Sequence, residues 1–153
     1  MIMKVKNIFV LIVTAVLLAG CTQNHGYIGR LFGSWTLYAM TENGENVDIS
    51  VHGDTFWSFQ SDVIMMTRVF DHGTHEKRFG TWTETDNELI LNFNHKYEGT
   101  PSGTGAYAPF EWLGMPGTDN IVLHYIEKER QRMAFDYTAP DGTEYQYFLK
   151  KTY

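Results

Sequence analysis

The chain has 153 residues, about the length of one domain, and carries 18 acidic against 12 basic side chains, a net charge of −6. An acidic protein of this size has no electrostatic basis for binding nucleic acid. It contains one cysteine, so a packed core rather than an internal disulfide must stabilise the fold. An aromatic content of 15% supplies apolar area for that core, because each buried ring removes about 150–250 Å² from water.

The first 20 residues have the features of a signal peptide. Lys4 and Lys6 form a short basic region, and residues 8–18 are apolar with a single exception. This apolar run has the length of a signal-peptide core and is too short to span a bilayer comfortably. The small pair Ala19-Gly20 follows it and supplies a cleavage site.

The residues Leu18-Ala19-Gly20-Cys21 resemble the lipobox of bacterial lipoproteins. The resemblance implies that the Cys21 thiol receives a diacylglyceryl group, that the chain is cut before it, and that Cys21 becomes an N-terminus acylated with fatty chains such as palmitate. Two or more such chains hold a protein stably on a membrane without a transmembrane helix. An ordinary signal peptide followed by a chance cysteine is the alternative.

We therefore expect a signal peptide over 1–20, a lipidated tether over 21–29 and one folded domain over 30–153. Loss of the signal peptide leaves 10 basic against 18 acidic residues, a net charge of −8. Thr22 stands where an aspartate would resemble an inner-membrane retention signal, and no acidic cluster resembling a surface-export tether follows it. The expected location is the cell envelope, lipid-anchored at the outer membrane and facing the periplasm.

Beyond residue 31, apolar and polar side chains alternate with period two, which predicts β-strands. In the first of these strands, Trp35, Leu37 and Ala39 share one face. Turn signals separate several strands, and the polar stretch 41–53 is expected to be a turn or a long loop. Eight strands are expected, at residues 34–40, 55–60, 63–70, 76–84, 88–94, 120–127, 131–138 and 143–151.

The region 120–138 has a competing interpretation as a helix over 127–135, but Tyr125, Phe135 and Tyr137 favour strands. Eight short antiparallel strands joined mostly by tight turns predict an all-β fold. The fold class that we expect is an eight-stranded antiparallel up-and-down barrel, in which closure removes the sheet edges. A β-sandwich is the alternative.

Residues 95–119 interrupt the strand pattern. Glycine or proline stands at eight of these positions, which excludes a long helix or strand. The same stretch carries Tyr107, Phe110 and Trp112, and a loop with so much apolar surface must pack on something. We expect this segment to form a flap over an opening.

Two Gly-x-Trp signatures lie in the first and fourth expected strands, at Gly33 and Trp35 and at Gly80 and Trp82. Such a signature in the first strand resembles the lipocalin and wider calycin pattern, and residues 145–151 resemble the last strand of small bacterial lipocalin-like lipoproteins. The resemblance implies that Trp35 packs across the closed end of the barrel and that Gly33 allows a close backbone approach there. The second and third conserved segments of animal lipocalins and their C-terminal helix have no clear counterpart.

No pattern in the sequence predicts catalysis or a metal centre. His72 and His75 are the only histidines close in sequence, and a solvated turn explains them better than a metal site, which needs three or four converging ligands. No serine stands in a Gly-x-Ser-x-Gly elbow, and no glycine-rich phosphate loop precedes a helix. We expect a protein that is not an enzyme and that holds neither cofactor nor metal.

An eight-stranded barrel is wide enough either to be filled by side chains or to hold one small ligand. A lining that mixes methionine with aromatic rings suits an adaptable apolar pocket, and it suits a solid core equally well. The inward-facing candidates for such a pocket are Leu37, Trp57, Phe59, Met65, Trp82, Leu91, Tyr125, Met133, Phe135, Tyr145 and Tyr147.

The leading functional hypothesis is a lipid-anchored barrel that binds a small hydrophobic ligand. The alternative is an envelope scaffold or protein-interaction module with a filled barrel, which would expose an apolar patch on residues 99–117. A protease inhibitor built on such a barrel rests on fold analogy alone.

Overall fold

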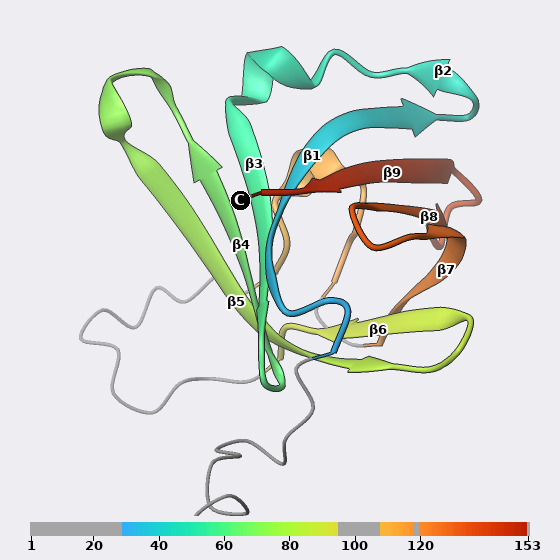
Figure 1. The fold of residues 1–153 in the computed structure, drawn as a ribbon. Coiled ribbons are helices and arrows are strands. Elements are labelled where there is room, and N and C mark those ends of the chain that lie inside the picture. Colours follow the sequence, from blue (N-terminus) through green and yellow to red (C-terminus); the bar gives the residue numbers. More distant parts are fainter. Residues whose placement is uncertain (1–28, 95–107, 118–119, 153) are drawn as a thin grey trace, which may run out of the picture.

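The computed structural model describes residues 29–94, 108–117 and 120–152, which form a strongly bent antiparallel sheet closed into a barrel (Figure 1). Cys21 and the expected signal peptide lie outside the described residues. The strands are β1 (Gly33–Glu42), β2 (Glu45–Asn46), β3 (Asp54–Gln60), β4 (Val63–Val69), β5 (His75–Glu84), β6 (Glu88–Asn92), β7 (Ile121–Lys128), β8 (Arg132–Thr138) and β9 (Glu144–Lys151). The connections contain three 3-10 turns, η1 (Ile49–His52), η2 (Asp71–Gly73) and η3 (Glu111–Leu113).

The sheet closes because its last strand pairs with its first. From β3 to β9 each strand pairs antiparallel with the next, β1 pairs with β3, and β9 returns to pair with β1. β2 has two residues and extends β1 as a short hairpin, so eight strands form the wall. Since β9 bonds β8 on one side and β1 on the other, the wall has no free edge at that seam. The predicted eight-stranded antiparallel barrel is confirmed, and the β-sandwich alternative is wrong.

One local prediction needs refinement, and one alternative is excluded. The stretch 41–53 is not one loop, because Asn43 and Gly44 take positive φ values and form a tight turn that pairs β2 with β1. η1 then begins after Asp48, whose carboxylate accepts a hydrogen bond from the Ser50 backbone N–H at 3.1 Å. The competing helix over 127–135 is also wrong, because those residues form the hairpin between β7 and β8.

The inner face of β1 differs from strict alternation. A β-bulge between Leu37 and Ala39 resets the side-chain phase, so Tyr38 is exposed and Met40 is buried. The expected face of Trp35, Leu37 and Ala39 is therefore wrong at its third member, where Met40 takes the inward place. A bulge also interrupts β7 between Tyr125 and Glu127, where it pairs with β8, and the alternation along β7 alone does not report it.

Met65 lies on the outer face of β4, contrary to its prediction as an inward residue. Ile64 and Met66 are fully buried and pair with Phe59 and Trp57, two inward side chains of β3. Because side chains alternate along a strand, Met65 must point away from them. Residues 63–66 are all apolar, so this part of the sequence carries no alternation from which the inward face could be assigned.

Aromatic side chains fill the middle of the barrel. The Trp57 ring lies 5.6 Å from Tyr147 and 6.3 Å from Phe135, measured between ring centroids. None of these three side chains is accessible to water, and a side chain with no accessible area borders no void large enough for a water molecule. The barrel is therefore solid around these residues.

The end of the barrel at which β1 begins is closed by residues 29–32. Leu31 and Trp35 are fully buried, and the Trp35 indole N–H donates to the Leu31 carbonyl at 2.8 Å. The Lys151 ammonium lies 5.0 Å from the centroid of the Trp35 ring and donates to the Arg30 carbonyl at 3.3 Å. The fold thus has one sealed end, which we call the closed end.

The two signature glycines are required for different reasons. Gly33 has a φ of 111°, which side-chain-bearing residues rarely adopt, but a Cβ there would meet Lys151 only at an ordinary 3.5 Å. The expected close approach at Gly33 is therefore wrong, and backbone conformation explains this glycine. At Gly80 a Cβ would lie 2.6 Å from the Asn92 carbonyl oxygen, so the close approach occurs in the second signature. Trp82 is half-buried and meets Phe59 edge-on at 5.5 Å.

No helix in the described part of the chain is long and apolar enough to cross a membrane.

Candidate functional site

The end opposite the closed end, which we call the mouth, is covered by residues 108–117, the mouth segment. This segment contains η3 and appears as the golden ribbon behind β1 in Figure 1. Phe110, Leu113 and Met115 turn into the core and are at most 3% exposed. The Tyr147 hydroxyl, on β9, donates to the Leu113 carbonyl at 2.5 Å. The segment is thus tied to the barrel interior, and its described part buries these apolar side chains instead of presenting them as a patch.

Gly114 lets the mouth segment pass directly over the barrel wall. Its φ of 69° is left-handed, and a Cβ at this position would collide with the ring of Tyr145. Of the predicted flap residues, Phe110 is buried, Trp112 is half-buried, and Tyr107 lies outside the described residues.

A cavity of about 470 Å³ remains at the mouth, between η1, the β4–β5 hairpin and the mouth segment. A volume of this size falls in the range of small-molecule sites, about 300–1,000 Å³. Its wall on β4 and β5 continues the inward face of the barrel, because Arg68 follows Ile64 and Met66 at period two. The lining residues are His52, Arg68, Glu76, Arg78, Phe110, Glu111 and Trp112.

The two arginines are held in place largely without carboxylates. The Arg68 Nε donates to the His52 backbone carbonyl, and its guanidinium carbon lies 4.2 Å from the centroid of the Phe70 ring. The Arg78 guanidinium carbon lies 4.9 Å from the Phe110 ring centroid. Glu76 stands opposite Arg68 across the hairpin, yet its recorded ion pair is with Arg78 at 4.0 Å, which is too long for a hydrogen bond.

His52, on η1, lines the cavity together with the arginines of the β4–β5 hairpin and with the mouth segment. Its ring stacks on Trp112 with centroids 4.4 Å apart and an interplanar angle of 8°. Burial lowers the pKa of His52, the positive charge of Arg68 lowers it further, and Asp48 opposes both effects. His52 is therefore mainly neutral at pH 7. The Trp112 indole N–H is buried and has no hydrogen-bond partner among the described residues.

The predicted pocket residues do not line this cavity. Most of them form the solid centre of the barrel, Tyr125 and Tyr145 are half-buried at its edge, and Met65 lies outside. The Tyr125 hydroxyl donates to Glu84 at 2.8 Å, and Lys128 pairs with the same carboxylate at 2.9 Å. The fully or nearly fully buried members are Leu37, Trp57, Phe59, Leu91, Met133, Phe135 and Tyr147.

The sequence-based reasoning missed the four charged or titratable residues on the strands and on η1. Arg78 carried a usable signal, because it is a charged residue in phase with Trp82, a predicted inward residue of the same strand. Arg68 did not, because the predicted inward residue Met65 placed it on the outer face. A positively charged side chain that points into the barrel near the end of a strand indicates that the barrel is open to water there. His52 carried no such signal, since it belongs to a connection whose path depends on the whole fold.

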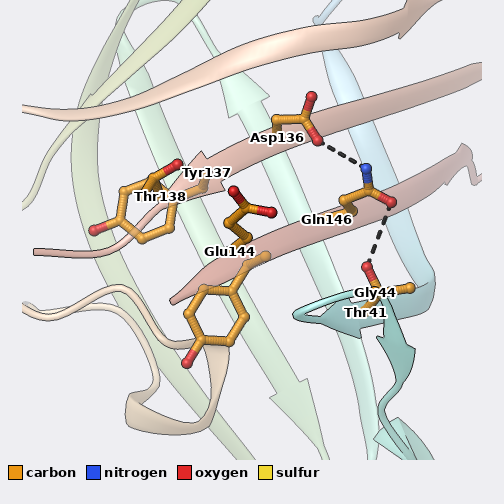
Figure 2. A pocket seen from close by; sticks show the side chains of 8 residues that line it. Thr41, Gly44, Asp136, Tyr137, Thr138, Glu144 and Gln146 are labelled. Atoms are coloured by element: carbon orange, nitrogen blue, oxygen red, sulfur yellow. Dashed lines mark hydrogen bonds between the residues drawn. The ribbon is translucent and has the colours of Figure 1, made fainter. Parts of the chain in front are cut away.

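A second hollow, of about 360 Å³, lies on the outer side near the mouth (Figure 2). Its side chains are engaged with one another: the Gln146 amide donates to Asp136 at 2.9 Å and accepts from Thr41 at 3.4 Å. It therefore offers fewer unused donors than the mouth cavity. Its lining residues are Thr41, Gly44, Asp136, Tyr137, Thr138, Glu144, Tyr145 and Gln146.

Within the described residues, no three His, Cys, Asp or Glu side chains converge closely enough to hold a metal ion. His72 and His75 are both exposed at the β4–β5 turn.

A sealed end, a covered mouth and a lined cavity beneath the cover define a small barrel of the lipocalin-like class. Residues 16–136 match the lipocalin-like domain family, and the chain belongs to that family. No curated protein matches it.

Two solved structures share the fold. A lipocalin-like protein from Bacteroides uniformis ATCC 8492 superposes with a TM-score of 0.53 and 18% identity, over 81% of this chain and all of that one. An uncharacterized protein from Bacteroides eggerthii DSM 20697 gives a TM-score of 0.54 and 17% identity, over 80% of this chain and 99% of that one. At this identity the likeness concerns the fold alone.

Proposed function

We propose that this protein is a lipid-anchored envelope protein that binds a small hydrophobic ligand in the mouth cavity. The observation that carries the proposal is the 470 Å³ cavity, which combines aromatic rings with polar groups on inward faces of a closed barrel. Small-molecule sites have this composition, an apolar wall with a few placed polar groups that fix orientation. The ligand would lie beneath the mouth segment rather than in the barrel centre, which Trp57, Phe135 and Tyr147 fill.

The proposed anchor would attach to the chain at the closed end of the barrel, away from the mouth. The chain enters at the closed end, where the Arg30 guanidinium donates to the Lys128 carbonyl at 2.6 Å. A tether of eight residues between Cys21 and residue 30 spans at most about 29 Å, so the closed end would stay near the membrane. The mouth lies at the opposite end and would open toward the aqueous side. The function would be non-enzymatic, with no cofactor.

Ligand binding is tested with the exported protein carrying Cys21→Ser, so that no acyl chain competes for the cavity. Isothermal titration calorimetry with dodecanol and with dodecanoate should show one site with a micromolar dissociation constant. Trp112→Ala should weaken binding, because it removes the aromatic wall, whereas Phe79→Ala, a change at an exposed ring on the outer face of β5, should leave it unchanged. Absence of binding below millimolar concentrations for every amphiphile would contradict the proposal.

The anchor is tested separately. The wild-type protein should sediment with outer membranes and yield an N-terminal peptide with the mass of an acylated cysteine. Cys21→Ser should move it to the soluble fraction. A wild-type protein that fractionates with the inner membrane would contradict the expected location.

A further inference from the structure

We propose that the ligand is an amphiphile with an anionic head group, a carboxylate or phosphate, bound by Arg68 and Arg78, with its apolar part against Trp112. This inference rests on the proposed function, because it names the ligand class of the same cavity. It goes beyond a generic hydrophobic ligand, since an apolar molecule would use neither arginine.

The first argument is that Arg68 has no counter-ion among the described residues. Its side chain is half-buried, and among the described residues no carboxylate lies within 4.0 Å of it. A guanidinium has five N–H donors, and among the described residues the Arg68 guanidinium uses only the one on Nε, toward the His52 carbonyl. Within that part of the chain, four donors therefore remain unused at the cavity wall. A partly buried cation without a counter-ion is costly, and a bound anion would remove that cost.

Arg78 supplies the second half of the head-group site. It faces the same cavity from β5, and its position over the Phe110 ring uses no N–H donor. One recorded hydrogen bond, from Nη1 to the Lys77 carbonyl at 3.1 Å, leaves most of its donors unused. Carboxylates and phosphates bind such planar forks through paired hydrogen bonds, which gives orientation as well as affinity.

Acidic residues do not already neutralise this site by contact. Glu76 approaches Arg78 only to 4.0 Å, and Glu111, in the first turn of η3, is exposed and forms no ion pair with another described residue. The formal charges of the lining nevertheless balance, with two arginines against two glutamates and a mainly neutral His52. Recognition would therefore depend on directed hydrogen bonds from the guanidinium groups rather than on a net positive field.

The pKa of His52 provides an independent test of whether an anion binds at Arg68. The charged groups around it are Asp48 beside η1, Arg68 on β4, Glu76 and Arg78 on β5, and Glu111 on the mouth segment. An anion bound at Arg68 offsets the positive charge that now lowers the pKa of His52, so binding should raise that pKa. By linkage, affinity should increase as the pH falls through the raised pKa of His52 in the complex. An NMR titration of the His52 ring protons, with and without ligand, measures this shift directly.

The test uses the exported protein carrying Cys21→Ser and four probes with one chain length: dodecanoate, dodecyl phosphate, dodecanol and dodecyltrimethylammonium. We expect the two anionic probes to bind at least about 10-fold more tightly than dodecanol, and the cationic probe more weakly than dodecanol. Acetate and inorganic phosphate, added alone, should bind far more weakly than their dodecyl counterparts. Equal binding of the free anions would contradict an amphiphile.

Arginine variants assign the head-group site. Arg68→Gln and Arg78→Gln should each weaken dodecanoate binding by about 10-fold and leave dodecanol binding within about 2-fold. Arg132→Gln, at an exposed position on β8, is the matched control and should change neither. Arg68 also donates to the His52 carbonyl, so Arg68→Gln could lower stability as well as affinity. A thermal melt of Arg68→Gln and binding by Arg68→Lys control for this effect. If Arg68→Gln does not fold, the binding result for Arg78→Gln tests the anionic head group.

The outcomes separate the two proposals. If dodecanol binds as tightly as dodecanoate and the arginine variants bind both alike, the anionic head group is wrong while the mouth cavity remains a binding site. If dodecanoate binding leaves the pKa of His52 unchanged, the anion is not at Arg68. If no probe binds, the proposed function itself fails, and this inference fails with it.

Discussion

The closed end and the mouth are built from opposite ends of the same strands, yet they use their polar groups differently. At the closed end, Trp35 donates to a backbone carbonyl, Lys151 is held by another carbonyl, and Lys128 pairs with Glu84. At the mouth, Arg68 keeps most of its donors unused and the Trp112 N–H has no partner among the described residues. These groups at the closed end are satisfied internally, although the buried Trp82 indole N–H beside the β3–β4 turn has no partner among the described residues, whereas the mouth leaves charged donors available beside a cavity.

The largest expected effect concerns the closed end. Trp35→Ala should lower the free energy of unfolding by about 3–5 kcal/mol, because it removes a fully buried indole and its hydrogen bond. Phe32→Ala, three residues earlier and 40% exposed, is the control and should cost much less. Urea denaturation followed by circular dichroism measures both. If Trp35→Ala lowers the free energy of unfolding by less than about 1 kcal/mol, the closed end does not act as a structural seal.

A pair of glycines tests how tightly the mouth segment is seated. Gly114 and Gly117 both have positive φ, but a side chain at Gly114 would collide with Tyr145, whereas nothing lies within 4 Å of a Cβ at Gly117. Gly114→Ala should therefore cost about 2–4 kcal/mol and Gly117→Ala about 1 kcal/mol. Denaturation midpoints give the difference. Equal costs would indicate that the segment is not held against the wall.

The pH dependence of stability should reflect tyrosines at the two ends. Burial raises the pKa of Tyr147, and burial together with the Glu84 hydrogen bond raises the pKa of Tyr125. Above about pH 10 these groups lose protons in the unfolded chain but keep them in the native state. Stability should thus fall with rising pH, by up to about 1.4 kcal/mol per pH unit for each group.

Tyr147→Phe and Tyr125→Phe should each make this alkaline decline shallower. Tyr147→Phe should also increase amide hydrogen exchange in residues 108–117, because it removes the bond to the Leu113 carbonyl. Tyr125→Phe should leave exchange there unchanged. Identical exchange in both variants would contradict a mouth segment tied by Tyr147.

The smallest effect is expected from His52. Its pKa is lowered in the native state by burial first and by Arg68 second, so the unfolded chain binds the proton more readily. Stability should fall slightly as the pH decreases through the unfolded value of about 6.5. His52→Phe, which keeps an aromatic ring against Trp112, should remove this dependence. The same slope in wild type and variant would show that His52 is not the titrating group.

Much of the fold could be predicted because strand alternation is a local property. In the run 88–93, the predicted inward residues Leu89, Leu91 and Phe93 are fully buried, and Ile90 is the one apolar residue on the opposite face. The run 63–66 carries no alternation, and there the inward face could be assigned only from the pairing of Trp57 with Met66. The bulge beyond Leu37 could not be predicted from the sequence either. It is defined by the register between β1 and β9, two strands more than 100 residues apart.

The candidate site was less predictable than the fold. The breaker-rich segment was expected to pack its aromatic side chains on the barrel, and in its described part, 108–117, Phe110 does so. The cavity, however, joins His52 from η1, Arg68 and Arg78 from a hairpin, and Trp112 from the connection before β7, far along the chain from the other three. Nothing in the spacing of these residues indicates that they meet.

The sequence by itself determined eight wall strands in order, an apolar core rich in aromatic residues and a breaker-rich connection, since each follows from period-two alternation, from composition or from glycine and proline. Only the tertiary structure decided which face Met65 takes, that aromatic rings fill the barrel centre, and that unused arginine donors gather at one end. The physical reason is that side-chain direction is repeated locally along a strand, whereas closure, register and filled volume depend on contacts between residues far apart in the chain.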